Sequence, residues 1–242
     1  MGLFDFITGG SIEKQIGKHA ARLKKKDAQQ EDRIASAYWL AEQGTVESIM
    51  GLLGRFEMTY EHQMKDASEK EVVSRLVREL GETAVPSIEH FLRKSRQFAR
   101  PLALYQEIVG PERTLDILFE LLEAEAKKSE LKPEKKRALL IKLAEFTDDR
   151  IEAATLPFLE DFDEGVRFGA IEVLIAQGET DAIREGLLKV LGDPEEESNR
   201  VRVRVAEIAA GRSWPLGDAL AFVTENPPSG WGVARGRMVA RG

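Results

Sequence analysis

Residues 161–196, DFDEGVRFGAIEVLIAQGETDAIREGLLKVLGDPEE, have the pattern of two amphipathic helices in succession. In the first half, apolar residues recur at helical spacing at Val166, Ala170, Ile171, Leu174 and Ile175. Gly178 follows, where a left-handed helix C-cap favours glycine. In the second half, one face carries Ile183, Leu187, Leu188 and Leu191, before the breaker Gly192-Asp193-Pro194. The stretch therefore predicts a helix pair whose apolar faces need a neighbouring element to cover them.

The same pattern recurs along the chain: a basic residue, apolar residues at helical spacing, and a closing glycine. The closing positions are 44, 81, 110, 147, 178 and 211, with Thr147 in place of glycine. The steps between them are 37, 29, 37, 31 and 33 residues, which is typical of repeats built from helix pairs. Because one pair cannot bury its apolar stripe alone, neighbouring pairs must stack to form a core. We expect an all-α superhelix of about six helix pairs.

The repeat also predicts the domain organisation. Residues 1–30 are expected to form an N-terminal hook and a capping helix, and residues 31–226 the continuous array of helix pairs. Residues 227–242 form a tail rich in glycine and arginine, for which a short hairpin and a disordered segment both remain open.

Two segments depart from the simple pattern. Pro157 falls inside an expected second helix and is predicted to bend it. Residues 200–205, RVRVRV, alternate like a strand, yet the apolar residues Val201, Val205, Ile208 and Ala209 keep helical spacing. We therefore expect a helix in this second segment.

Residues 161–196 resemble a HEAT repeat of the short bacterial type that also occurs in phycobilin lyases. The resemblance rests on Asp163, Val166, Arg167, Ala170, Leu174 and Gly178, followed by the second amphipathic helix. Residues 82–94, ETAVPSIEHFLRK, are similarly typical of a second helix with a leading proline. The resemblance covers about residues 31–225 and implies an α-solenoid whose second helices line the concave face. It implies little about function, because such repeats serve many purposes.

Composition excludes several classes of protein. Among 242 residues there is no cysteine, which excludes disulfides, thiolate zinc sites, iron–sulfur clusters and a cysteine nucleophile. The 35 basic and 42 acidic residues give a net charge of −7, which argues against a body built to bind nucleic acid. No apolar run is long enough to span a membrane, and the N-terminus does not have the pattern of a secretory signal. We expect a cytoplasmic protein.

The negative charge is concentrated on the expected second helices. The second helices, expected over residues 45–57, 82–94, 111–126, 148–161, 179–191 and 214–225, contain 19 acidic and 7 basic residues. The first helices, expected over residues 31–43, 69–80, 96–109, 133–146, 163–177 and 199–210, have charges that sum to +1. The clearest acidic line is formed by Asp116, Glu120 and Glu123, and the other candidate residues on these helices are Glu152, Glu160 and Asp181. We predict that these residues bind a basic segment of a protein partner, the alternative being a solvated face without a partner.

Basic residues gather near the two ends of the chain, at Lys24 to Lys26 and at Arg235, Arg237 and Arg241. For each cluster two interpretations remain open: a solubilising surface, or a contact with lipid or nucleic acid.

The sequence predicts no catalytic, cofactor or metal site. His19, His62 and His90 lack a second histidine at i+3 or i+4, and no phosphate-binding glycine loop or nucleophile elbow occurs. Two enzyme alternatives remain. The first is an enzyme similar to the HEAT-like DNA alkylpurine glycosylases, in which Trp214 and Asp218 would share a helix face. The acidic groove expected here would, however, repel the phosphates of DNA. A bilin lyase is the other. We predict a non-enzymatic scaffold or adaptor.

Overall fold

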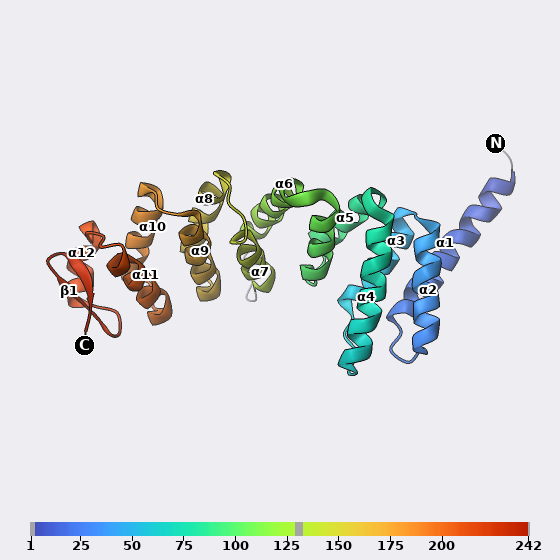
Figure 1. Ribbon diagram of the computed structural model, residues 1–242, viewed down its shortest axis with the longest axis horizontal. Coiled ribbons are helices and arrows are strands. Elements are labelled where there is room, and N and C mark those ends of the chain that lie inside the picture. The colour runs from blue at the N-terminus through green and yellow to red at the C-terminus, as the bar shows by residue number, and fades with distance from the viewer. Residues whose placement is uncertain (1–2, 129–132, 242) are drawn as a thin grey trace. The chain divides into compact units, whose positions relative to one another are not determined.

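The computed structural model describes residues 3–128 and 133–241, with side chains from residue 12 onward. The described chain is helical almost throughout, and its only sheet is a two-stranded hairpin near the C-terminal end (Figure 1). The all-α fold expected from the sequence is thus confirmed. The chain divides into two compact units, Met1–Ile117 and Leu118–Gly242, and each has its own packing.

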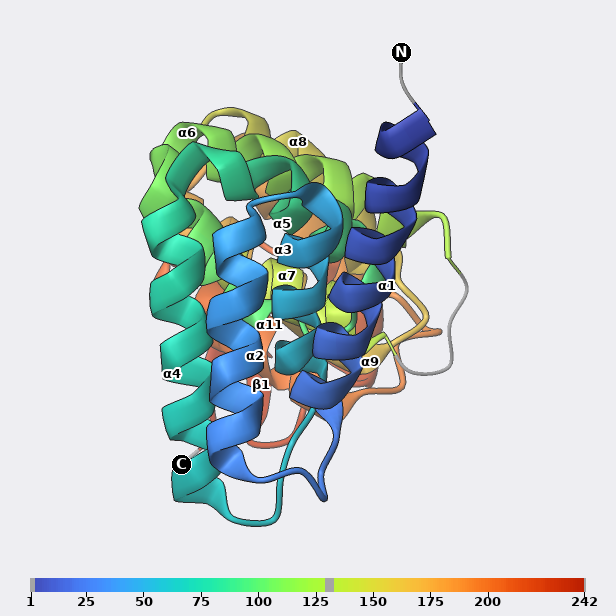
Figure 2. The same ribbon diagram turned by 90° about the vertical axis from the view of Figure 1, so that its right-hand side faces the viewer.

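The first unit is built from helices in two layers. They are α1 (Leu3–Lys24), α2 (Gln30–Gln43), α3 (Val46–Leu53), α4 (Gln63–Leu80), α5 (Val85–Lys94) and the first part of α6 (Ala99–Ala126). Two 3-10 turns, η1 (Gly54–Glu57) and η2 (Gly81–Ala84), extend α3 and precede α5. Helix α2 packs on α4 and α3 packs on α5, so first and second helices form separate layers (Figure 2). Helix α1 covers both α2 and α3.

Local sequence explains how one pair turns into its second helix. Gly44 has a φ of 59° and ends α2 in the left-handed conformation that glycine adopts at no steric cost. Thr45 then caps α3, because its hydroxyl accepts from the Ser48 amide at 3.2 Å while the Ser48 hydroxyl accepts from the Thr45 amide at 3.0 Å. The turn is therefore only two residues long.

Helix α6 contains two of the expected helices joined by a kink. Gly110 has φ 81° and ψ 178°, a conformation open only to glycine, and Pro111 follows it. The expected helices over residues 96–109 and 111–126 therefore meet without an intervening loop.

The second unit repeats the two-layer arrangement. Its helices are α7 (Glu134–Leu143), α8 (Arg150–Thr155), α9 (Glu164–Gln177), α10 (Asp181–Gly192), α11 (Asn199–Gly211) and α12 (Leu220–Glu225). The 3-10 turns η3 (Leu156–Glu160) and η4 (Gly217–Ala219) adjoin α8 and α12. Helix α9 packs on α7 and α11, while α10 packs on η3, η4 and α12. First helices again form one layer and second helices the other.

The two segments that depart from the repeat both lie in helical structure. The α-helix of α8 gives way to the 3-10 turn η3 at Pro157, which lacks the amide that would continue the α-helical hydrogen bonds. The alternating segment over residues 200–205 lies in α11, with Val201 and Val205 fully buried.

The C-terminal residues form a β-hairpin, β1 (Trp231–Ala234) with β2 (Arg237–Ala240). Arg235 and Gly236 both have positive φ, 51° and 72°, as a two-residue hairpin turn of the right twist requires. Met238 is buried, β2 packs on α11, and the Leu216 amide donates to the Gly236 carbonyl at 2.9 Å. The hairpin therefore covers the last helix pair of its unit.

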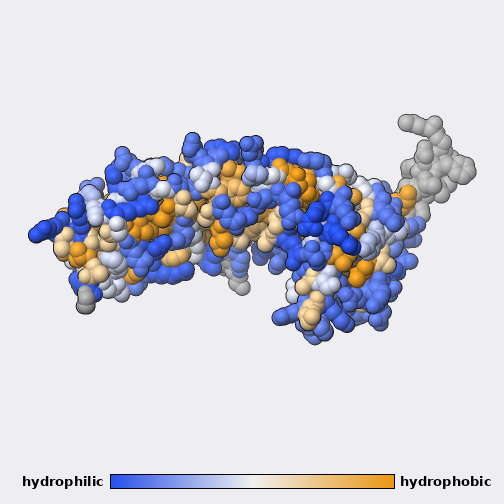
Figure 3. All heavy atoms as spheres, in the orientation of Figure 1, coloured by the Kyte–Doolittle hydropathy of each residue, from blue (hydrophilic) through white to orange (hydrophobic). Residues whose placement is uncertain are grey.

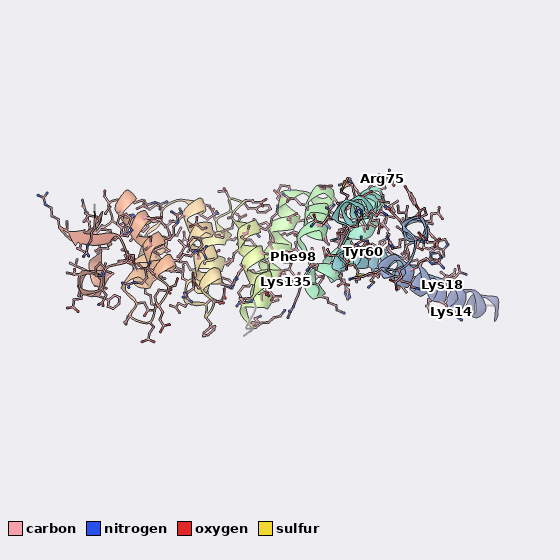
Figure 4. All side chains as sticks on the ribbon, turned by 90° about the horizontal axis from the view of Figure 1, so that it is seen from below. Lys14, Lys18, Tyr60, Arg75, Phe98 and Lys135 are labelled. Carbon is pink, nitrogen blue, oxygen red and sulfur yellow. The ribbon has the colours of Figure 1, made fainter. Side chains whose placement is uncertain are left out.

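A buried ionic network joins α2, η1 and α4 in the first unit. The Glu69 carboxylate accepts from Arg33 at 2.5 Å and from Arg55 at 3.2 Å, and Arg55 also donates to Asp66 at 2.7 Å. The Tyr60 ring (labelled in Figure 4) lies beneath both guanidinium groups, 4.6 and 4.1 Å from their carbons. Burial opposes ionisation of Asp66, but hydrogen bonds from Lys70 and Arg55 outweigh it and lower its pKa.

Gly192, at the end of α10, lies close to the 3-10 turn η4 in the second unit. A Cβ added there would lie 2.8 Å from the Cβ of Ala219 and 2.9 Å from its Cα. We expect Gly192→Ala to lower the free energy of unfolding by about 1–3 kcal/mol, because α10 and η4 must move apart. Urea unfolding followed by circular dichroism measures the change.

The matched control is Gly211→Ala, at the end of α11, where an added Cβ meets no atom within 4 Å. This variant should unfold at the same urea concentration as the natural chain or a higher one. Equal stabilities of the two alanine variants would contradict the close contact at Gly192.

Candidate protein-binding surface

Ion pairs link successive helix pairs within each unit. Their partners are 26 to 32 residues apart, which is close to the steps of the sequence repeat. The pairs are Arg78–Glu107 at 2.6 Å, Arg137–Asp163 at 2.5 Å, Arg167–Glu196 at 2.6 Å and Arg204–Glu172 at 2.6 Å. Part of the chain's negative charge is therefore matched by a cation of the neighbouring pair.

The acidic line predicted on α6 is exposed but not free. Asp116, Glu120 and Glu123 all lie on the surface of the helix after the kink. Glu123 accepts from Lys127 at 2.8 Å, and this hydrogen bond lowers the pKa of the Glu123 carboxyl. Asp116 and Glu120 also interact with neighbouring groups. The cations of a partner protein would therefore compete for these exposed carboxylates with the groups that already interact with them.

The other three predicted residues lie in the second-helix layer of the second unit. Glu152 lies on α8, Glu160 in η3 and Asp181 at the start of α10. Lys189 pairs with Glu160 at 2.5 Å, and Arg184 pairs with Asp181 at 2.9 Å. Of the six predicted residues, only Glu160 lines the groove that η3 and α10 form in this layer.

This groove runs along the second-helix layer and has a volume of about 1040 Å³. It is lined by η3, by the turn after η3, by Arg167 of α9, by α10 and by the loop after α10. Its apolar wall consists of Leu156, Leu159, Phe162, Ala182 and Val190. Patches of hydrophobic residues within a hydrophilic surface are also visible on the face of the second unit in Figure 3.

The rim of the groove is strongly acidic. Seven acidic side chains line it against two basic ones, Arg167 and Lys189. Both cations are engaged: Arg167 binds Glu196 through two hydrogen bonds of 2.6 Å, and Lys189 binds Glu160. These hydrogen bonds raise the pKa of Arg167 and of Lys189, so both stay charged and paired. The charge left for a ligand is negative.

The residues that distinguish this groove were not among the predicted site residues. Phe162 and the glutamates Glu185, Glu195 and Glu197 were all missed. The sequence does contain a signal, since Phe162 stands between two aspartates off the helical stripe, and three glutamates follow Pro194. Their proximity across the groove depends on the stacking of α10 on η3.

The shared helix face of Trp214 and Asp218 is not observed. Trp214 lies in the loop before η4 and is buried, and its indole N–H donates to Glu179 at 2.7 Å. The indole therefore packs between helix pairs and presents no exposed platform for a base. Within residues 12–128 and 133–241, no group of three or more histidine, aspartate or glutamate side chains is arranged to hold a metal ion.

No helix in the described part of the chain combines the length and the apolar character needed to cross a membrane. Comparison with known proteins finds no matching family, no similar curated protein and no similar solved structure.

Proposed function

We propose that this chain is a non-enzymatic protein-binding scaffold of the cytoplasm that uses its acidic second-helix layer to bind a basic segment of another protein. We also propose that the helix pairs form a HEAT-type α-solenoid and that the chain binds no cofactor. The observation that carries it is the concentration of negative charge on the second helices, where 19 acidic residues stand against 7 basic ones.

Three features support this function. Helix pairs stack in two layers within each unit, as in proteins that bind partners along a continuous surface. Negative charge is concentrated on one layer, which steers a basic partner and repels an acidic one. The groove adds apolar surface, and burial of apolar side chains supplies affinity that exposed ion pairs alone do not.

Reversal of the acidic line on α6 tests the electrostatic part. The probe is a fluorescein-labelled lysine-rich peptide with one central phenylalanine, followed by fluorescence anisotropy at low salt. We expect a variant with Asp116, Glu120 and Glu123 all changed to lysine to bind about tenfold more weakly, since each exposed pair contributes a few tenths of a kcal/mol to 1 kcal/mol. Added salt should weaken binding of the natural chain in the same direction.

The control variant carries the same change in net charge on the other layer, with Glu42, Glu79 and Glu145 changed to lysine; all three are exposed. It should bind the peptide more tightly than the α6 variant does. Equal loss in both variants, or tighter binding of duplex DNA than of the peptide, would contradict the proposed function.

A further inference from the structure

Phe162 is the most exposed large apolar side chain of the described residues, with 91% of its surface in contact with solvent. It lies in the turn between η3 and α9, at the edge of the groove. A side chain of this size normally folds back onto the protein, because leaving it in water forgoes the free energy of burial. Its position therefore needs a structural reason.

The turn that carries Phe162 is held by an arginine. The Arg167 Nη1 donates to the carbonyls of Asp161 and Phe162, at 2.9 Å each. The same guanidinium is locked in place by Glu196, which is buried and also accepts from the Ser198 amide at 2.8 Å. Because both carbonyls are fixed, the backbone of the turn is rigid, and Phe162 projects from an ordered support.

The charges around Phe162 that remain for a ligand are acidic. Glu185, Glu195 and Glu197 are exposed and have no ion pair with any residue that the structure describes. The groove's two cations are already bound to Glu196 and Glu160. A ligand with positive charge on both sides of an apolar group would match this arrangement.

We propose that the groove binds a segment of another protein in which one large apolar side chain is flanked by lysine or arginine. The apolar side chain packs against Phe162 and the half-buried Leu156, and the flanking cations pair with Glu185, Glu195 and Glu197. This inference rests on the proposed function and places its main anchor in the second unit. Nucleic acid does not fit, because its phosphates would face the acidic rim.

A double-mutant cycle tests the apolar contact. The lysine-rich peptide with a central phenylalanine and its serine version are titrated into the natural chain and into Phe162→Ala. We expect Phe162→Ala to weaken binding of the phenylalanine peptide about tenfold and to leave the serine peptide almost unaffected, since only the former has a contact to lose. The control is Ile141→Ala on α7, where a side chain that is 68% exposed lies outside the groove; both peptides should bind it as they bind the natural chain.

A second pair of variants tests the cations. Glu185→Gln with Glu197→Gln should reduce affinity for both peptides several-fold, because each loses attraction to the flanking lysines. Glu145→Gln with Glu207→Gln, two glutamates that do not line the groove, should change neither.

Other results would overturn the inference in distinguishable ways. Peptide binding that responds to the α6 reversal but not to Phe162→Ala or to the loss of Glu185 and Glu197 removes the groove and leaves the proposed function standing. Absence of binding of either peptide at low salt removes both. Self-association that depends on Phe162, detected by sedimentation, would identify a second copy of this chain as the occupant and overturn the inference.

Discussion

Glu69→Gln is expected to lower the free energy of unfolding by about 4 kcal/mol, because it removes the carboxylate that two buried arginines share. Arg55 is fully buried and Arg33 nearly so, and neither guanidinium can recover the lost ion pair from water. Asp66, which binds Arg55 and Lys70, would then be the one carboxylate of this network, and its charge does not neutralise Arg33, Arg55 and Lys70 together. Urea unfolding followed by circular dichroism measures the loss.

The control lies on the same helix. Glu71 is 64% exposed and pairs with Arg100 at 3.2 Å, so Glu71→Gln should change stability by less than about 1 kcal/mol. Similar losses in the two glutamine variants would show that the buried network does not stabilise the first unit. A further variant, Arg33→Met in the Glu69→Gln background, should recover part of the loss, because it removes one of the unbalanced charges.

Glu196→Gln should destabilise the second unit by about 3 kcal/mol. The side chain is 3% exposed and accepts two hydrogen bonds of 2.6 Å from Arg167 and one from the Ser198 amide. Loss of the charge leaves Arg167 largely buried without a counter-ion, and a hydrogen bond to a charged group contributes more than a neutral one. Thermal and urea unfolding of the full chain report the change.

Glu164→Gln provides the comparison for this position. Glu164 pairs with Arg200 at 3.8 Å, and both side chains are about half exposed. Its loss should stay within about 0.5 kcal/mol. If Glu196→Gln were equally mild, the turn that supports Phe162 would not depend on the Arg167–Glu196 pair.

Much of the fold could be predicted because its core is apolar and periodic. The spacing of Val166, Ala170, Ile171 and Leu174 predicts α9, and all four side chains are buried. Helix α4 shows where this fails: it begins at Gln63, not at residue 69. Its first turns bury Asp66 and Glu69 against arginines, and buried charges carry no apolar signal.

The residues of the candidate site were harder to predict from the sequence. Counting charges by helix identified the acidic layer, but it could not show that Glu160, Asp181 and Glu123 already have cationic neighbours. Nor could it place Phe162 beside the glutamates of another helix pair. Which carboxylates remain free depends on side-chain geometry across the stack, and one sequence does not encode this as a pattern.

The ion pairs that join successive helix pairs have a consequence for how such a chain changes in length. Each pair links residues about one repeat apart, for example Arg167 with Glu196 and Arg204 with Glu172. Duplication of a whole helix pair would copy the donor and the acceptor together, so every new junction would contain both residues of its ion pair. An insertion of a few residues within a helix would shift one side of a junction relative to the other and break its ion pair. Growth by whole repeats is therefore the low-cost route along which this array can lengthen.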